Sequence, residues 1–221
     1  MSQKRTLARF LAEQSISEDD PTGWFEVLYA KAKSEELPVP WADMAPNPNL
    51  MEWLEQTKID GKNKNALKIG CGLGDDAEAL SRQGFDVIGF DISETAIAWC
   101  MGRFPKTRVQ YITADLLNAP SEWHGHFDFV LESYTLQVLP DPLRSDAIKI
   151  ISDFVAPGGT LLVICRARDV QDDPRQMPWP LLRSELDAFL DWGLSQKSFE
   201  DYFDNEDPPV RRFRAVYEKE V

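Results

Sequence analysis

The chain has 221 residues, 43% of them hydrophobic, and a formal net charge of −13 at neutral pH. This length and apolar content suit one globular domain with a large core. So acidic a chain repels phosphate backbones and anionic membranes, which argues against both as partners. No apolar run approaches the roughly 20 residues of a membrane span, and residues 1–14 lack a signal-peptide pattern, so we expect a cytoplasmic protein.

Cysteine and histidine usage argues against disulfides and against a metal ion. The three cysteines, Cys71, Cys100 and Cys165, are odd in number and lie in apolar stretches. The two histidines, His124 and His126, are not accompanied by further ligands at the spacing of a zinc site. We therefore predict neither a disulfide framework nor a metal site.

The N-terminal part of the sequence predicts helices rather than strands. Apolar positions indicate one helix around residues 7–11, a second over residues 24–33 and a third that begins at Asn47-Pro48. Residues 37–48 hold four prolines and should form a stiff, extended connector. We expect residues 1–64 to lie as a helical lid over the strand ends of the domain formed by residues 65–221. Plain packing against the core is the alternative.

After residue 65, short apolar runs alternate with helical patterns, which is typical of a parallel sheet covered on both faces. Five strands are predicted over residues 66–69, 85–90, 108–113, 127–132 and 160–165, with helices over residues 75–83, 93–104 and 143–155. A helix over residues 183–192 and strands over residues 198–203 and 210–218 follow. Because the last two strands are close in sequence, we expect an antiparallel hairpin at the edge of a seven-stranded, mostly parallel α/β sheet.

The most informative stretch is a glycine loop, Gly70-Cys71-Gly72-Leu73-Gly74, between the first strand and the next helix. Glycines here let the backbone approach a ligand at the helix N-terminus, although a tight turn alone could need them. Asp91 ends the second strand and could accept both ribose hydroxyls of an adenosine. Asp115 follows the third strand and could accept the adenine amine. Because parallel strand ends share one crevice, the three features together predict an adenosine site.

The spacing of the glycines favours S-adenosylmethionine over a dinucleotide. A dinucleotide fingerprint needs Gly-x-Gly-x-x-Gly, whereas here the third glycine, Gly74, comes one residue early and Asp75 follows it. An acid at that place would repel a pyrophosphate but not a sulfonium ligand that carries an amino group. An NAD(P)-binding oxidoreductase and a catalytically silent cofactor-binding module remain the alternatives.

Two segments resemble a class I S-adenosylmethionine-dependent methyltransferase and, more narrowly, the thiopurine, thiol and halide methyltransferase group. They are GCGLGDDAEALSRQGFDVIGFDISETAI, residues 70–97, and ESYTLQVLPDPLR, residues 132–144. PVPWADMAPNP, residues 38–48, is similar to that group's N-terminal segment, and MPWPLLRSEL, residues 177–186, to its proline-aromatic loop.

The resemblance implies a Rossmann-like seven-stranded fold and S-adenosyl-L-methionine as cofactor, with S-adenosyl-L-homocysteine as product. It implies that the cofactor contacts Trp41, Gly70, Gly72, Gly74, Asp76, Asp91, Ile92, Asp115, Leu116 and Glu132. One position departs from the class. Where many class I enzymes have an acid near the amino group of the cofactor, this chain has Lys68.

Four residues are candidates for binding the methyl acceptor, which we expect to be a small molecule. Trp41 and Trp179 lie in proline-rich loops beside the expected pocket, and Tyr134 follows the fourth strand. Arg166 ends the fifth strand, where it could hold an anionic acceptor or balance surface charge.

The chemistry of methyl transfer indicates which kind of acceptor atom to expect. Methyl transfer from a sulfonium is an in-line displacement that gains most from alignment and from exclusion of water. A thiol or another soft nucleophile needs no general base, which favours such an acceptor. A carboxylate, hydroxyl or amine is the alternative. A hydroxyl or an amine needs a base, for which Glu132 and Tyr134 are candidates, with pocket lining as their other possible role. The sequence leaves the oligomeric state open.

Overall fold

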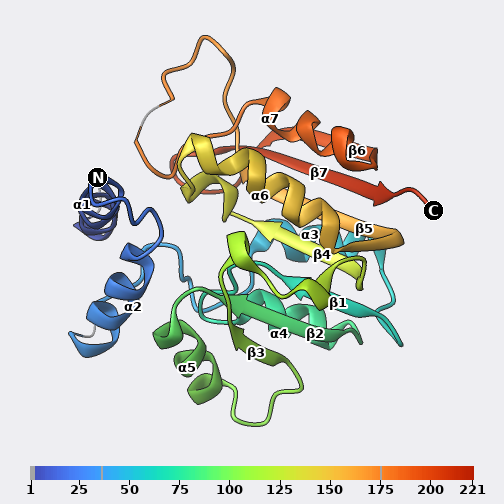
Figure 1. Cartoon of the computed structure of the whole chain (residues 1–221), viewed down its shortest axis with the longest axis horizontal. Helices are drawn as coiled ribbons and strands as arrows, with labels where there is room; N and C mark the ends of the chain where they lie inside the picture. The colour runs from blue at the N-terminus through green and yellow to red at the C-terminus, as the bar shows by residue number, and fades with distance from the viewer. Residues whose placement is uncertain (1–2, 36, 175) are drawn as a thin grey trace.

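A seven-stranded sheet forms the centre of the molecule (Figure 1). The computed structural model describes residues 3–35, 37–174 and 176–221. The strand order is β3-β2-β1-β4-β5-β7-β6, in which β1 to β5 are parallel and β7 is antiparallel to both of its neighbours. The strands are β1 (Asn65–Lys68), β2 (Asp86–Asp91), β3 (Gln110–Thr113), β4 (Phe127–Ser133), β5 (Val155–Arg166), β6 (Leu194–Phe203) and β7 (Arg211–Lys219). The predicted Rossmann-like α/β fold with an antiparallel C-terminal hairpin is confirmed.

Helices cover both faces of the sheet because successive side chains of each buried strand point to opposite faces. Along β5, Leu161 and Val163 join one apolar core, whereas Leu162 and Ile164 join the other. The first core packs against α6 and α7, and the second against α3 and α4. The helices that follow the glycine loop in sequence are α4 (Asp75–Arg82), α5 (Glu94–Arg103), α6 (Asp141–Phe154) and α7 (Arg183–Asp187).

Two boundaries differ from the sequence prediction. Helix α6 passes directly into β5, so Pro157-Gly158-Gly159, which lies between the helix and the strand predicted from the sequence, belongs to the strand. There the pairing of β5 with β4 is irregular, between Phe127 and Phe129. The helix predicted over residues 183–192 divides into α7 and a 3₁₀ helix, η4 (Ala188–Trp192). Gly193 then ends it with a φ of +74°, in the left-handed region that glycine adopts without strain.

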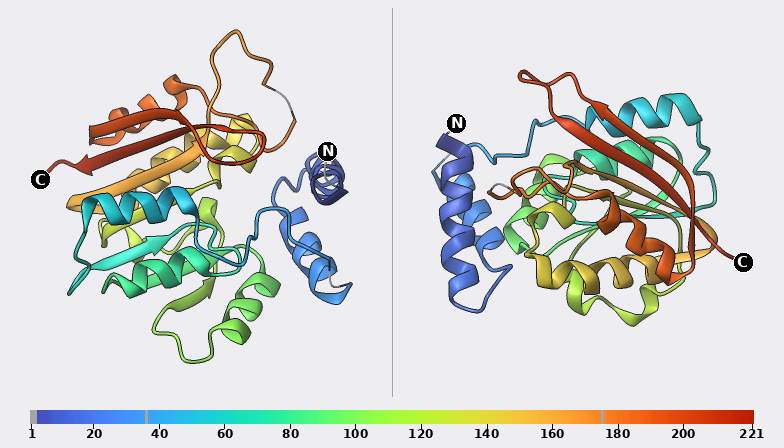
Figure 2. Two further views of the ribbon diagram at one scale, coloured as in Figure 1. Left: turned by 180° about the vertical axis from the view of Figure 1, so that it is seen from behind. Right: turned by 90° about the horizontal axis from the view of Figure 1, so that it is seen from above.

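The N-terminal part contains three helices, α1 (Gln3–Ser17), α2 (Trp24–Ser34) and α3 (Pro48–Thr57). Asn47 caps α3, since its side chain accepts the N–H of Asn49 at 2.9 Å. Leu50, Trp53 and Leu54 of α3 are buried in the core on one face of the sheet. Helices α1 and α2 instead stand to one side of the sheet, beyond the carboxyl ends of β1, β2 and β4 (Figures 1 and 2).

Hydrogen bonds tie α1 and α2 to the sheet domain at two places. The Glu26 carboxylate of α2 accepts from the Ser93 hydroxyl at 2.6 Å and from the Thr95 N–H at 3.1 Å, at the start of α5. On the other side, Arg9 of α1 donates to the Met177 carbonyl at 2.7 Å. These contacts hold the segment across the strand ends. Among the described residues, no helix combines the length and the apolarity needed to cross a lipid bilayer.

The packing of α3 predicts that Trp53→Ala destabilises the fold strongly. Trp53 is 6% exposed and its ring stacks on that of Phe129, with centroids 5.6 Å apart. We expect a loss of about 3–5 kcal/mol in the free energy of unfolding, measured by urea denaturation. Met51→Ala on the exposed side of the same helix is the control and should change it by about 0.5 kcal/mol at most. Equal effects of the two substitutions would contradict the burial of this face of α3 against the sheet.

Candidate active site

A cavity of about 990 Å³ lies at the carboxyl ends of the parallel strands. Its lining includes the glycine loop after β1, Asp91 at the end of β2 and Asp115 after β3. From the other half of the sheet come Tyr134, after β4, and Arg166, at the end of β5. Residues of α1, α2 and the connector before α3 complete the wall. One cavity thus joins the predicted cofactor residues to the predicted acceptor residues.

The glycine loop has a backbone that only glycine adopts easily. Gly70, Gly72 and Gly74 have φ values of +54°, +56° and +92°, in the left-handed region. A Cβ atom on Gly70 would lie 2.6 Å from the Thr135 hydroxyl oxygen, and one on Gly74 would lie 2.5 Å from that of Tyr111. Side chains are therefore excluded at Gly70 and Gly74, where bare backbone lines the cavity.

Asp91 has the position and the free acceptor capacity that an adenosine needs. Its two carboxylate oxygens accept the N–H groups of Gly72 at 2.9 Å and Ser93 at 3.1 Å. A carboxylate offers about four lone-pair sites, so each oxygen can still accept a ribose hydroxyl. Burial raises the pKa of Asp91 to about 6, against the lowering effect of these N–H groups. Asp115, on the same side of the cavity, accepts the N–H of Leu117 at 2.9 Å. The residues present therefore fit the adenosine part of S-adenosylmethionine.

Lys68 and Asp76 lie beside the glycine loop. Lys68 is 3% exposed, and its ammonium group donates to the carbonyl oxygens of Ile69 at 2.7 Å and Gly70 at 3.3 Å. The Asp76 carboxylate accepts the N–H of Asn47 at 2.7 Å, which ties the start of α4 to the cap of α3. Burial raises the pKa of Asp76, while the positive charge of Lys68 opposes that shift. The lysine thus supplies positive charge under the loop, where an acid is common in the class.

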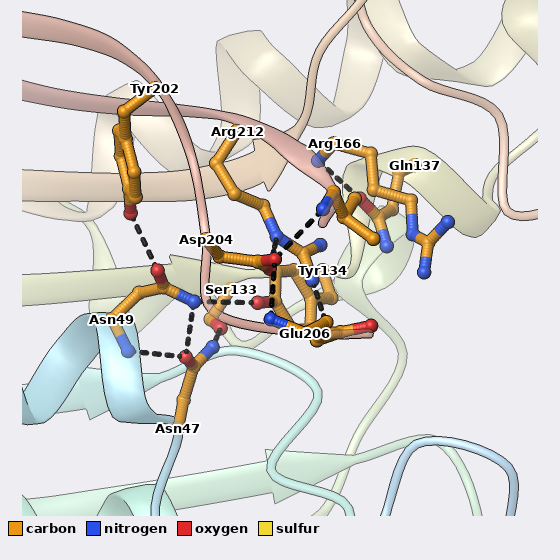
Figure 3. A network of polar contacts seen from close by, with 11 residues as sticks. Asn47, Asn49, Ser133, Tyr134, Gln137, Arg166, Tyr202, Asp204, Glu206 and Arg212 are labelled. Carbon is orange, nitrogen blue, oxygen red and sulfur yellow. Dashed lines mark hydrogen bonds and ion pairs between the residues drawn. The ribbon is translucent and has the colours of Figure 1, made fainter. Parts of the chain in front are cut away.

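Tyr134 stands at the acceptor side in a backbone conformation that is unusual for tyrosine, with a φ of +68°. Its ring packs on the Arg212 guanidinium, whose central carbon is 4.8 Å from the ring centroid. Its hydroxyl accepts from the Asn49 side-chain N–H₂ at 3.2 Å. Figure 3 shows these groups converging from the end of β4, from β7 and from α3. Arg166 lines the same wall, and its backbone N–H donates to the Gln137 side chain at 2.8 Å.

Trp41 joins the cavity to the core of the N-terminal helices. It lines the cavity, and its indole N–H donates to the Tyr29 hydroxyl at 2.9 Å. Its ring meets those of Trp24 and Tyr29 edge-on, with centroids 6.0 and 5.8 Å away. The structure therefore brings Trp41 to the predicted position while also giving it packing partners.

The structure does not bring two predicted site residues to the cavity lining. Glu132 is fully buried, and one of its oxygens accepts the N–H groups of Thr135 at 2.8 Å and Leu136 at 2.9 Å. It therefore fixes the turn after β4, and its other oxygen has no hydrogen-bond partner among the described residues. Burial raises the pKa of Glu132 to about 7. Trp179 packs beside Arg144 and donates its backbone N–H to the Gln137 carbonyl at 2.7 Å.

Every other predicted cofactor and substrate residue lines the cavity, although its role in binding stays a prediction. From the loop that carries Trp179, Met177 and Pro178 reach the lining instead. Lining residues that the sequence reasoning missed include Tyr29, Asn47, Asn49, Gln137, Met177, Tyr202, Asp204, Glu206 and Arg212. The expected hairpin of the last two strands did not indicate Arg212, because its place in the cavity depends on the pairing of β7 with β5.

Fold and site together define a class I methyltransferase architecture, and comparison with known proteins agrees. Residues 66–159 match the family model described as a methyltransferase domain. The chain is 28% identical over 167 residues to the 2-heptyl-1-hydroxyquinolin-4(1H)-one methyltransferase of Mycobacteroides abscessus, covering 73% of this chain and 72% of that one. It is 30% identical over 115 residues to the ubiquinone biosynthesis O-methyltransferase of Bordetella avium, covering 51% of this chain and 47% of that one.

A solved structure shares the fold over the full length of the chain. This is the 1,6-didemethyltoxoflavin-N1-methyltransferase of Burkholderia thailandensis, crystallised with S-adenosylhomocysteine. The two superpose with a TM-score of 0.68 at 15% identity, over 100% of this chain and 92% of that one. The matched domain, the fold and the named relatives together support an S-adenosylmethionine-dependent methyltransferase. The chain spans about half the length of the ubiquinone relative, and none of these similarities supports the narrower thiopurine, thiol and halide group.

The geometry of Asp91 predicts that Asp91→Ala weakens binding of S-adenosylhomocysteine at least roughly tenfold, by loss of charge-assisted hydrogen bonds. Calorimetry measures the dissociation constant. Asp86→Ala is the matched control, since Asp86 is an exposed aspartate at the other end of the same strand, and it should leave the affinity unchanged. Equal affinities of wild type and Asp91→Ala would show that the adenosine does not bind at this carboxylate.

The same residue gives the affinity a pH dependence. The pKa of Asp91 is raised to about 6, so its carboxyl group is ionised above that pH and gains a proton below it. Wild-type affinity for S-adenosylhomocysteine should therefore fall as the pH is lowered from about 7.5 to about 5, and the fall should be absent in Asp91→Ala.

The place of Trp41 predicts that Trp41→Ala lowers methyl transfer at least roughly tenfold through loss of alignment and water exclusion. The free energy of unfolding of this variant should fall by only about 1–2 kcal/mol, because Trp41 is half-buried. Trp99→Ala is the control, a half-buried tryptophan packed in the same apolar cluster but outside the cavity lining. Turnover and melting temperature are measured side by side. Unchanged turnover in Trp41→Ala, or an equal fall in turnover in Trp99→Ala, would show that Trp41 and the helices before it only pack against the core.

Proposed function

We propose that this methyltransferase transfers a methyl group to a hydroxyl oxygen of a small, planar acceptor that binds as an oxyanion. The observation that carries the proposal is the single cavity that extends from the glycine loop and Asp91 to the arginines of β5 and β7. The names of the relatives support oxygen, because one is an O-methyltransferase and the other acts on a hydroxyquinolone. The expectation of a thiol has no such support.

When bound, S-adenosylmethionine supplies a methyl group activated on a sulfonium sulfur. The chain's own residues bind and orient the reactants. Asp91 would hold the ribose and Asp115 the adenine amine, while the bare backbone of Gly70 to Gly74 allows close approach. Trp41 and the helices before it cover the strand ends and exclude water, which strengthens the electrostatic interactions inside. Tyr134 and Arg166 form the wall against which the acceptor would lie.

Neither predicted base is suited to take a proton from the acceptor. The carboxylate of Glu132 is turned towards backbone N–H groups and lies outside the cavity lining. Burial raises the pKa of Tyr134, so its hydroxyl is protonated at neutral pH and can donate to an oxyanion. We therefore infer an acceptor whose hydroxyl is acidic enough to ionise without a protein base. A thiolate shares this property and is the second candidate.

An acceptor screen tests the proposal. Phenols, N-hydroxy heterocycles, thiols, carboxylates and amines are compared by the release of S-adenosylhomocysteine, and acidic hydroxyl compounds should react fastest. For two active acceptors of different acidity, kcat/KM should rise with pH to a midpoint that follows the acceptor's own pKa. A midpoint that stays fixed for both would reveal a base on the protein. Turnover of thiols alone would establish sulfur as the acceptor atom.

A further inference from the structure

A buried arginine at the acceptor wall has an unusual set of neighbours. Arg212 of β7 is 1% exposed and lines the cavity. Its Nε donates to the Asp204 carboxylate and its Nη2 to that of Glu206, both at 2.6 Å. One face of its guanidinium lies over the Tyr134 ring. The tip of the β6–β7 hairpin, residues 204–210, thus fixes Arg212, and Arg212 in turn supports the tyrosine (Figure 3).

A second arginine stands directly opposite in the sheet. In the antiparallel pairing of β5 with β7, Arg166 is the partner of Arg212, and both line the cavity. Side chains of directly opposed residues lie on the same face, and like charges in that position repel. An anion bound in the cavity beside both arginines would relieve that repulsion. The pairing therefore places two guanidinium groups side by side at the acceptor wall.

The two carboxylates that hold Arg212 differ in exposure. The Asp204 side chain is 7% exposed, whereas that of Glu206 is 49% exposed. Because Glu206 is half-exposed, a ligand can replace its contact with Arg212 more easily than that of the enclosed Asp204. The contact with Asp204 is enclosed and keeps the guanidinium in place. Neither of these two hydrogen bonds uses the Nη1 group of Arg212.

The tyrosine completes the wall. A non-glycine residue with positive φ needs neighbours that hold it there, and for Tyr134 these are the Arg212 guanidinium and Asn49. Asn49 is itself fixed, because its side-chain carbonyl accepts the Tyr202 hydroxyl at 2.7 Å. A planar ring, a guanidinium fork and a hydroxyl donor therefore converge on one part of the cavity.

We propose that Arg212, with Arg166 and the Tyr134 ring, forms an oxyanion subsite that selects planar, negatively charged acceptors, and that Glu206 occupies one edge of it until the acceptor displaces it. This inference rests on the proposed function, since it names the acceptor class of the same site. Arg212 determines specificity through charge and through the planar fork that a lysine lacks.

The test compares 4-hydroxybenzoate with 4-hydroxybenzamide, two planar molecules of the same shape that differ in charge. Binding of each to the protein saturated with S-adenosylhomocysteine is measured by calorimetry at millimolar concentration. Wild type should bind the anion roughly tenfold more tightly than the amide. Glu206→Gln should strengthen binding of the anion roughly threefold, because the competing carboxylate is gone. Arg212→Lys should reduce the preference to roughly twofold or less, with the affinity for S-adenosylhomocysteine kept.

Arg214→Lys is the matched control. Arg214 is an equally buried arginine of the same strand, held by Glu200 and Glu52, and it does not line the cavity. It should keep the preference for the anion. Equal affinity of wild type for both probes, absence of binding of either, or a preference that survives Arg212→Lys would overturn the inference. An equal loss of the preference for the anion in Arg214→Lys would also overturn it. The proposed function has its own test. It fails if the acceptor screen releases no S-adenosylhomocysteine, even when the binding experiment shows the preference for the anion.

Discussion

The position of the cavity follows from a reversal in the order of the strands. From β1 the chain builds outward through β2 and β3 on one side, and then returns to place β4 and β5 on the other. The connections that leave β1 and β4 therefore diverge, and a crevice opens at the carboxyl ends of the strands. The glycine loop, Asp91 and Asp115 line one half of the cavity, and Tyr134 and Arg166 the other. Helices α1 and α2 and the tip of the β6–β7 hairpin then enclose the crevice from outside.

Electrostatic balance inside this crevice depends on Lys68. A buried ammonium without opposite charges nearby would cost several kcal/mol. Here the lysine bonds to two carbonyl groups of the loop, and its charge lowers the pKa of Asp76 and Asp91 against the opposing effect of burial. Asp76 and Asp91 are thus kept closer to ionised at neutral pH. This explains how the site accommodates a lysine at a position where many enzymes of the class have an acid.

Local patterns could be predicted from the sequence, and long-range geometry could not. Gly70 and Asp91 could be recognised because a strand, a loop and a helix follow one another directly at these positions. The role expected for Glu132 depended on the direction of its side chain, which the turn after β4 decides by offering two N–H groups. Arg212 was missed because its place depends on the register of β7 against β5, which puts it opposite Arg166. The acceptor wall is therefore the part of the site that sequence reasoning described least.

Calorimetric titration of the wild-type protein with S-adenosylhomocysteine and, separately, with NADH tests most directly whether the crevice is a methyltransferase cofactor site. We predict saturable binding of one S-adenosylhomocysteine per chain and no binding of NADH, because a pyrophosphate would meet the Asp76 carboxylate at the start of α4 and the glycine spacing departs from the dinucleotide fingerprint. Saturable binding of NADH without any binding of S-adenosylhomocysteine would contradict the assignment of the glycine loop and Asp91 to an S-adenosylmethionine site.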